Sequence, residues 1–401
     1  MRNRISHGKT VPALAAALYL TAAGTAWAGA GGTGGGGAVF SVMHTFTGAD
    51  GSRPFGSLLW RQGRVFGTTS GGGPWNAGTA FQFVVSGGVY NVLHAFAGGT
   101  LDGAGPLSGL IIDSIGNLYG TTFEGGAANA GTMYKINFLG GFQLLHSFAG
   151  SPLEGSGPAG TLVMDPAGNI YGTTYTGGRS DGWGTTFEWT AAGIYFTGQS
   201  FSPDGALPRA GLVRAGAHLY GTTLGGYGDA PAGSVYEANT RPALYTFTGG
   251  ADGAQPMASL IIDGLGHLLG TAMAGGSDSL GFGHGVVFQI EIATGALTVL
   301  HTFTGPDGSA PMGSLALDTS GNLYGTTMWG GAFNNGTVFR LDSSGNFTTL
   351  YSFTGGADGG NPFAGVALDT SNDLWGVTSA GGSAPAPDGD GVLFMIALAP
   401  T

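Results

Sequence analysis

Residues 109–126 read GLIIDSIGNLYGTTFEGG, and variants of this stretch recur along the whole sequence. The stretch combines a short apolar run, a turn at Gly116 and Asn117, a run of Thr and aromatic residues, and a pair of glycines. Its Gly-Thr-Thr core, or a close variant, recurs in seven copies, whose glycines are Gly67, Gly120, Gly172, Gly221, Gly270, Gly325 and Gly376. The copies are about 50 residues apart, a spacing typical of the blades of a β-propeller.

Each period contains four short segments with the character of β-strands. In the quoted period we expect strands at Leu110–Asp113, Leu118–Phe123, Thr132–Ile136 and Gln143–Phe148. These segments are rich in β-branched and aromatic residues and are bounded by Gly, Asn and Asp. No window shows the periodicity of a long helix. The sequence therefore predicts an all-β chain.

The phase of the repeats indicates a closed ring. A strand that ends at Phe46 precedes the first copy of the other three strands, and the last copy stops after its third strand, near Ile396. A linear stack gains nothing from this offset, whereas a ring uses it to remove an open sheet edge. We predict a seven-bladed β-propeller with four-stranded blades, in which the first strand of each blade is innermost and the N-terminal strand completes the last blade.

The N-terminal residues have the pattern of an export signal. Three basic residues within positions 1–9 precede the apolar stretch Val11–Ala23, and residues 26–28 read AWA, a small-x-small cleavage site. We expect a signal peptide at 1–28, a Gly-rich linker at 29–37 and the propeller at 38–401. The mature chain is then extracellular or periplasmic. No later apolar run is long enough to span a bilayer, so we expect no transmembrane segment after cleavage.

Composition excludes several classes of function. Only 9% of the residues are charged, and the formal net charge is −11, which opposes nucleic-acid binding. The absence of cysteine excludes disulfides and thiol chemistry. We find no nucleophile elbow, zinc spacing or phosphate loop, and therefore predict no catalytic residue and no cofactor.

The pattern acid-Gly-x-x-Pro recurs in every period, and its acidic residues are Asp50, Asp102, Glu154, Asp204, Asp252, Asp307 and Asp358. Clustered carboxylates can bind Ca²⁺. Each loop offers only one acid, however, and Asp before Gly commonly stabilises a turn. We therefore predict a structural turn in each loop and no metal site.

Four histidines share one position, two residues before the Phe that ends the fourth strand: His44, His94, His146 and His301. Equivalent positions on different blades lie far apart around a ring. We expect them to be half-exposed residues of the outer strands rather than metal ligands.

Departures from the repeat are where we expect a specific site. Trp75, Trp183 and Trp329 fall in or beside the loops between second and third strands, where exposed aromatic rings can stack on sugars or apolar ligands. The alternative is that they pack against neighbouring blades. The least regular region spans the third and fourth copies and contains Arg179, Asp181, Arg209 and Arg214. The ligand-binding candidates are Trp75, Trp183, Trp329, Arg179 and Asp181.

The repeat unit, best seen at Leu323–Phe339 and Leu350–Gly355, resembles the GloVer tandem repeat of exported bacterial "choice-of-anchor" proteins. The resemblance implies export and no established activity. The Asp-x-x-Gly-Asn-Leu-Tyr pattern at 113–119 is also similar to NHL-type propeller repeats, which supports the first strand as the inner one.

We therefore expect a secreted, monomeric, non-catalytic binding or scaffold propeller whose loops recognise a glycan, a peptide or a cell-surface component. One alternative is a polysaccharide-acting enzyme, either a lyase or a hydrolase. The other is a purely structural protein of the cell envelope.

Overall fold

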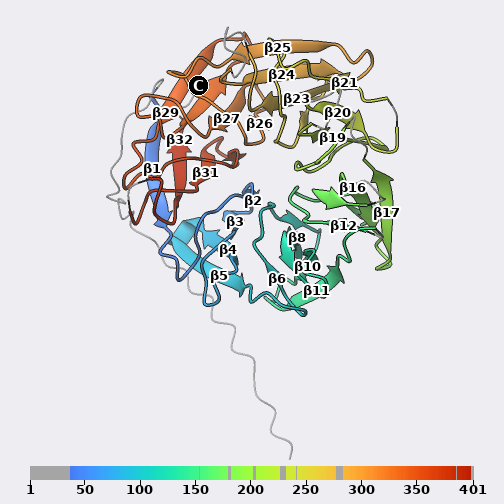
Figure 1. Ribbon diagram of the computed structural model, residues 1–401. Helices are drawn as coiled ribbons and strands as arrows, with labels where there is room; N and C mark the ends of the chain where they lie inside the picture. The colour runs from blue at the N-terminus through green and yellow to red at the C-terminus, as the bar shows by residue number, and fades with distance from the viewer. Residues whose placement is uncertain are drawn as a thin grey trace, which may run out of the picture.

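The computed structural model describes residues 37–398, except 153, 179–181, 202–204, 226–231, 241, 277–282 and 385. The expected signal peptide and nearly all of the linker lie outside the described residues. The described part forms seven four-stranded antiparallel sheets around a common axis (Figure 1). The seven-bladed propeller predicted from the sequence is confirmed.

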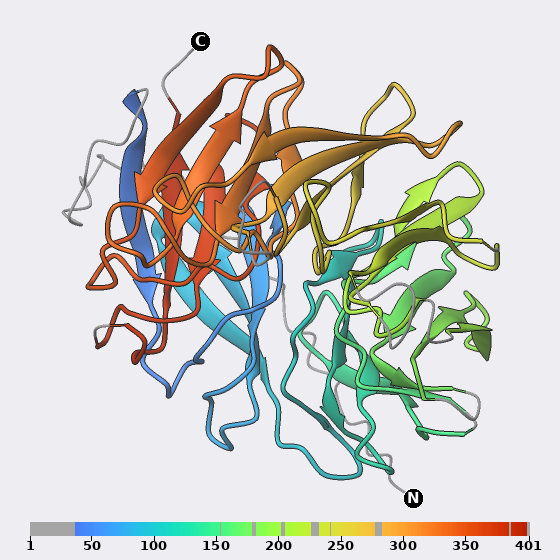
Figure 2. The same ribbon diagram turned by 45° about the horizontal axis from the view of Figure 1, so that its top comes forward.

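The blades follow one another around the ring in chain order (Figures 1 and 2). Blade 1 consists of β2 (Leu59–Arg61), β3 (Arg64–Thr69), β4 (Thr79–Val84) and β5 (Val89–Ala95), with a short 3-10 helix, η2 (Val85–Gly87), before β5. Blade 2 consists of β7 (Ile111–Ile112), β8 (Leu118–Thr122), β10 (Thr132–Ile136) and β11 (Phe142–Ser147). Blade 3 consists of β13 (Val163–Met164), β14 (Ile170–Thr174), β16 (Thr185–Trp189) and β17 (Tyr195–Ser200).

The remaining blades repeat this order. Blade 4 consists of β18 (Val213–Ala215), β19 (His218–Thr223), β20 (Ser234–Glu237) and β21 (Tyr245–Thr246). Blade 5 consists of β22 (Ile261–Ile262), β23 (His267–Ala272), β24 (Val286–Glu291) and β25 (Leu297–Thr302), and blade 6 of β26 (Ala316–Leu317), β27 (Leu323–Thr327), β28 (Thr337–Leu341) and β29 (Phe347–Ser352). Blade 7 joins β30 (Ala367–Leu368), β31 (Leu374–Thr378) and β32 (Val392–Ala397) to β1 (Val39–Thr45).

The Gly-Thr-Thr core has a separate structural role for each residue. In blade 6, Gly325 lies opposite Phe339 of the neighbouring strand, and a Cβ at this glycine would lie 2.5 Å from the phenyl ring. Thr326 Oγ1 donates to the carbonyl oxygen of Ala364 in blade 7 (2.8 Å). Thr327 Oγ1 bonds Thr337 Oγ1 of the next strand (2.8 Å). In this Gly-Thr-Thr motif, the glycine thus makes room for an aromatic ring, the first threonine joins two blades and the second threonine joins two strands.

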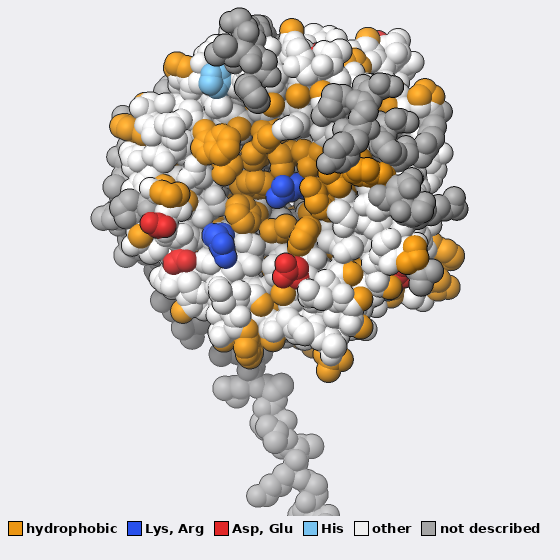
Figure 3. Space-filling model, viewed as in Figure 1, with side chains coloured by type: hydrophobic (Ala, Val, Ile, Leu, Met, Phe, Trp, Pro, Cys, Tyr) orange, Lys and Arg blue, Asp and Glu red, His pale blue; other side chains and the backbone are white. Residues whose placement is uncertain are grey.

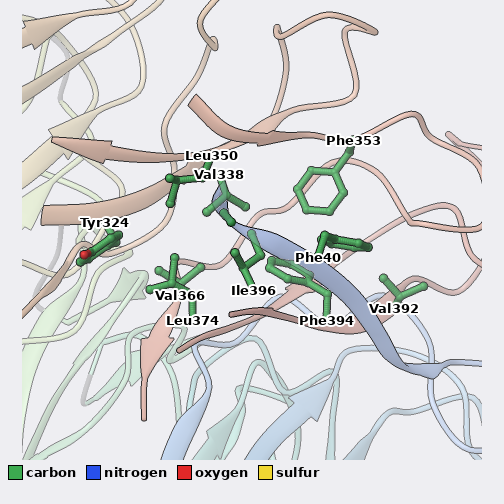
Figure 4. Packing of buried hydrophobic residues seen from close by; sticks show 11 residues of the cluster. Phe40, Tyr324, Val338, Leu350, Phe353, Val366, Leu374, Val392, Phe394 and Ile396 are labelled. Carbon is green, nitrogen blue, oxygen red and sulfur yellow. The ribbon is translucent and has the colours of Figure 1, made fainter. Parts of the chain in front are cut away.

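Pairing of β1 with β32 closes the ring. The register runs from Val39 opposite Ala397 to Thr45 opposite Val392. Phe40 is 1% exposed and stacks on Tyr351 at 4.0 Å between ring centroids. It also packs beside Phe353 and Phe394, so residues from both ends of the chain share one core (Figure 4).

The loops that enter each blade pair with the loops between its second and third strands. Two such pairs form short ribbons, β6 (Gly103–Ala104) with β9 (Glu124–Gly125) and β12 (Gly155–Ser156) with β15 (Thr176–Gly177). Single bridges join the same loops in other blades, for example Ser309 to Trp329. We call the side of the ring that carries these loops the loop face.

The recurrent acid and histidine belong to one structural unit at the outer rim. Asp50 accepts a hydrogen bond from the amide of Thr47 (2.9 Å), as expected of a turn residue, and its other oxygen lies 2.9 Å from His44 Nε2. The imidazole of His44 stacks at 3.9 Å on Tyr90 of the next blade. The acid–histidine contact recurs at His94, His146 and His301, and Tyr245 and Tyr351 bond the equivalent acids in blades 4 and 6.

Burial lowers the pKa of His44 and of His301 below the ordinary value of 6.5, although the neighbouring Asp50 and Asp307 act in the opposite direction. The folded state therefore binds these two protons less readily than the unfolded chain does. The contribution of both groups to the free energy of unfolding is present above the unfolded pKa and is lost as the pH falls below it.

The closing strand offers a direct test of the ring. We expect Phe40→Ala to lower the free energy of unfolding by about 3–5 kcal/mol, because it removes a buried ring from the core of blade 7. The neighbouring Val39 is 47% exposed, so Val39→Ala should change stability by less than about 0.5 kcal/mol. Chemical denaturation measures the free energy of unfolding of both variants and of the wild type. Equal effects would show that β1 does not close the ring.

The rim histidines generate a pH prediction. Tyrosine fills the same position in blades 4 and 6, so His44→Tyr combined with His301→Tyr should preserve the fold. The wild-type free energy of unfolding should fall as the pH is lowered through about 6.5, and the double variant should show a shallower dependence. Denaturation curves between about pH 5 and 8 test this expectation, which an unchanged slope would contradict.

Candidate functional site

The residue after the proline of each blade-entry loop lies at the opening of the central channel. We call these seven positions the mouth ring: Phe55, Leu107, Ala159, Arg209, Met257, Met312 and Phe363. They line one cavity of about 60 Å³. Figure 3 shows hydrophobic side chains gathered around this opening on the loop face, with a basic side chain at the centre. A cavity of this size admits a small group rather than a sugar ring.

Small residues from adjoining blades close around the channel below the mouth ring. The amide of Gly109 donates to Thr161 Oγ1 in the next blade (3.1 Å), and the amide of Gly211 donates to Ser259 Oγ (2.9 Å). A Cβ at Gly109 would lie 2.6 Å from the carbonyl oxygen of Ser57. Ser57, Thr161, Gly211 and Ser259 also line the cavity of about 60 Å³, so its wall combines the mouth ring with small residues of the adjoining blades.

Arg209 is the one charged member of the mouth ring. Its guanidinium lies 5.4 Å from the centroid of the Phe363 ring, a cation–π distance, and Phe55 packs edge-on to the same ring at 5.0 Å. All ion pairs among the described residues join a histidine to an acid. None of them joins Arg209 to a carboxylate. Burial lowers the pKa of the guanidinium from its ordinary value, but an arginine remains charged in proteins. Among the described residues, the mouth therefore contains a partly desolvated cation without an acidic partner.

The sequence places Arg209 in the irregular third and fourth copies but does not single it out as a site residue. A usable signal was present, because the residue after the recurrent proline is apolar in the other six periods. When the residues that follow the seven prolines are placed around the channel of a propeller, Arg209 is the one charged residue among them.

The three candidate tryptophans have different environments. Trp75 is 60% exposed in the loop between β3 and β4, and Trp329 is 44% exposed at the start of the loop between β27 and β28. Trp183 instead packs against the core cluster that contains Phe201, Leu212 and Tyr236. The structure therefore leaves Trp75 and Trp329 available on the loop face, whereas Trp183 takes part in packing.

Arg179 and Asp181 lie outside the described residues. Phe333, which sequence reasoning did not select, is 57% exposed in the same loop as Trp329. In the described part of the chain, no three His, Asp or Glu side chains converge in an arrangement suited to a metal ion. None of the helices described there is long and apolar enough to cross a membrane.

Comparison with solved structures identifies similar folds. An oligogalacturonate lyase in complex with manganese shares 9% identity with a TM-score of 0.58, over 92% of this chain and 96% of the lyase. The extracellular domain of a candidate hybrid two-component system from B. thetaiotaomicron shares 12% identity with a TM-score of 0.53, over 88% and 39% of the two chains. A candidate 6-phosphogluconolactonase from Bacteroides uniformis shares 16% identity with a TM-score of 0.50, over 78% and 88%.

These likenesses support the fold alone, because the identities are low. In two further matches the chain spans 26% of the tricorn protease and 63% of TolB from Acinetobacter baumannii, each with a TM-score of 0.44. A search of curated proteins finds no match.

A family model describes the sequence itself. The Gloeobacter/Verrucomicrobia repeat matches residues 24–177, 139–282 and 279–401, which together span the whole propeller. The resemblance to the GloVer repeat expected from the sequence is thereby confirmed. The chain belongs to the Gloeobacter/Verrucomicrobia repeat family.

Proposed function

We propose that this chain is an exported, non-catalytic binding propeller that captures its ligand on the loop face, at the mouth ring. The ligand is a glycan, a peptide or a cell-surface component that carries an anionic group. Arg209 contacts that group, and the rest of the ligand lies across the apolar members of the ring.

The environment of Arg209 is the observation that carries this proposal. A charge in apolar surroundings is costly unless it is paired and hydrogen-bonded. Arg209 has an aromatic neighbour but no carboxylate within the described residues. A carboxylate or another anion can accept two parallel hydrogen bonds from a guanidinium. An anionic ligand would therefore supply the partner that the described residues do not.

The chemical character of the mouth supports binding rather than turnover. General acid–base catalysis uses a titratable side chain within reach of the substrate, most often His, Asp or Glu. Among the described residues that line the cavity there is no His, Asp or Glu. The exposed rings of Trp75 and Trp329 add apolar surface on the same face, on blades 1 and 6.

The proposal is tested with glycan and peptide arrays that pair each anionic ligand with a neutral counterpart. We expect the anionic member to bind and Arg209→Met to weaken its binding by about 10- to 100-fold, the range expected for losing a charged hydrogen bond. Arg64→Met is a matched control, because Arg64 lies on β3 and bonds Gln82 Oε1 at the surface (3.0 Å). It should leave affinity unchanged.

Thermal unfolding separates a binding role from a structural one. If Arg209 serves a ligand, Arg209→Met should keep or raise the melting temperature while binding is lost. Equal binding of neutral and anionic ligands, or an effect of Arg64→Met as large as that of Arg209→Met, would refute the proposal. Consumption of a polysaccharide by the wild type would instead favour the enzyme alternative.

A further inference from the structure

Blades 1 and 2 share a cavity of about 430 Å³ on the loop face, which we call the side cavity. Its polar and large apolar wall residues are Ser70, Asn76, Leu107, Phe123 and Glu124. The two blades lie next to each other in the ring (Figure 1), and residues 37–152, which form both blades and the loops between them, are described without a gap. Leu107 also belongs to the mouth ring, so the side cavity adjoins the opening of the channel.

Two columns of the repeat explain why a cavity lies at this junction. One column is the residue after the Gly-Thr-Thr core, and the other is the residue before the recurrent proline of the next blade. At the junction of blades 2 and 3 these residues are Phe123 and Gly157, and a Cβ at Gly157 would lie 2.8 Å from the phenyl ring. At the junction of blades 1 and 2 they are Ser70 and Gly105, and a Cβ at Gly105 would lie 4.0 Å from the carbonyl oxygen of Ser70. The aromatic ring that covers Gly157 thus has no counterpart over Gly105 among the described residues.

Every other junction has at least one larger side chain in these two columns. The pairs are Phe123 with Gly157, Tyr175 with Leu207, Leu224 with Gln255, Met273 with Ala310, Met328 with Asn361, and Ser379 with Arg53. Blades 1 and 2 alone combine two small residues in the sequence. The side cavity is therefore a departure from the repeat, which is where a specific site is expected.

Two side chains of the wall have hydrogen-bonding groups that the described residues leave free. Asn76 Oδ1 accepts a hydrogen bond from the amide of Gly72 (2.9 Å), which fixes the side-chain amide and leaves its Nδ2 as a donor. Glu124 lies on the ribbon of β6 and β9, opposite Ala104. Its carboxylate is exposed and has no ion pair within the described residues. An ionised carboxylate only accepts hydrogen bonds, so the wall offers both an acceptor and a donor.

The rest of the wall is mostly apolar and uncharged. It includes Leu107, Phe123 and three alanines, and no Lys, Arg or His is among the described residues that line it. Trp75, which directly precedes Asn76, is 60% exposed on the same loop. The volume exceeds the roughly 150 Å³ that accommodates benzene, another six-membered ring, in a protein interior. The side cavity therefore suits a neutral ring that has polar edges and an apolar face.

We infer that the side cavity binds one neutral hexopyranose unit of a glycan. Each hydroxyl group of a pyranose both donates and accepts, so its hydroxyls can donate to Glu124 and accept from Asn76 while the C–H face of the ring covers Phe123. An ammonium group has donors only and would leave the Asn76 donor without an acceptor. An anionic unit would meet the Glu124 carboxylate and belongs instead at Arg209. The inference rests on the proposed function where it assigns the neutral unit and that anionic group to one ligand.

The side cavity is tested with the methyl glycosides of glucose, galactose and mannose, with cyclohexanol and butylammonium as controls. Ligand-observed NMR on the whole protein should detect binding of at least one glycoside and about tenfold weaker binding of both controls. Glu124→Gln removes the charged acceptor and should weaken glycoside binding by about 10- to 100-fold. Glu291→Gln is a matched control, because Glu291 is an exposed acid at the end of β24 that accepts from Thr294 Oγ1 (2.7 Å). It should leave glycoside binding unchanged.

Ser70→Phe fills the side cavity with the residue that blade 2 has in the same column. Because Phe123 occupies this position beside Gly157, Ser70→Phe should retain the circular dichroism spectrum of the wild type and abolish glycoside binding. The absence of glycoside binding to the wild type, or glycoside binding that neither Glu124→Gln nor Ser70→Phe changes, would overturn the inference. Tighter binding of butylammonium than of every glycoside would show a cation site and would also overturn it.

The link to the mouth ring is tested with a disaccharide of a hexuronic acid and the hexose that binds, against the methyl glycoside of that hexose. The disaccharide should bind about tenfold more tightly, and Arg209→Met should remove this gain without changing binding of the glycoside. Glu124→Gln should weaken binding of both. If Glu124→Gln weakens both while Arg209→Met has no effect, the proposed role of Arg209 is wrong and the side cavity stands. If Arg209→Met weakens disaccharide binding while Glu124→Gln has no effect, the side cavity is wrong and the role of Arg209 stands.

Discussion

An aromatic ring lying across a glycine is the contact on which each blade depends. The glycine of the second strand faces an aromatic residue of the third, as Gly67 faces Phe81 and Gly325 faces Phe339. A Cβ on either glycine would lie 2.5 Å from the ring. The ring can therefore lie over the glycine and share a core cluster with the leucine that directly precedes the innermost strand, Leu58 or Leu315. Much of the high glycine content of this chain follows from this packing and from its turns, and does not indicate disorder.

The fold was predictable because its determinants are local and repeated. The strand that ends at Phe46 and the last third strand near Ile396 were each recognisable, and their phase required a ring. The turn role of the acids was also accessible, since Asp50 bonds an amide three residues away. The stacking of His44 on Tyr90 was not, because it joins outer strands of two blades whose relative placement no local pattern specifies.

The candidate site was less accessible to sequence reasoning. Trp75 and Trp183 occupy similar loops, yet one is exposed and the other packs on a core cluster. Their difference depends on neighbouring loops rather than on their own surroundings in the sequence. Arg209 becomes significant only when residues from seven blades meet around one opening.

The closing of blade 7 has a consequence for how the molecule forms. β1 lies near the start of the given sequence and its partner β32 lies near the end. β1 therefore cannot form its native pairing until β32 has been synthesised. Bringing together such distant segments carries a chain-entropy cost, and non-local pairing slows folding. Until the final strand emerges, the apolar side of Phe40 has no β32 to cover it, and the sheet of blade 7 has an exposed edge. A chain built in this way can complete its ring only after β32 has left the ribosome.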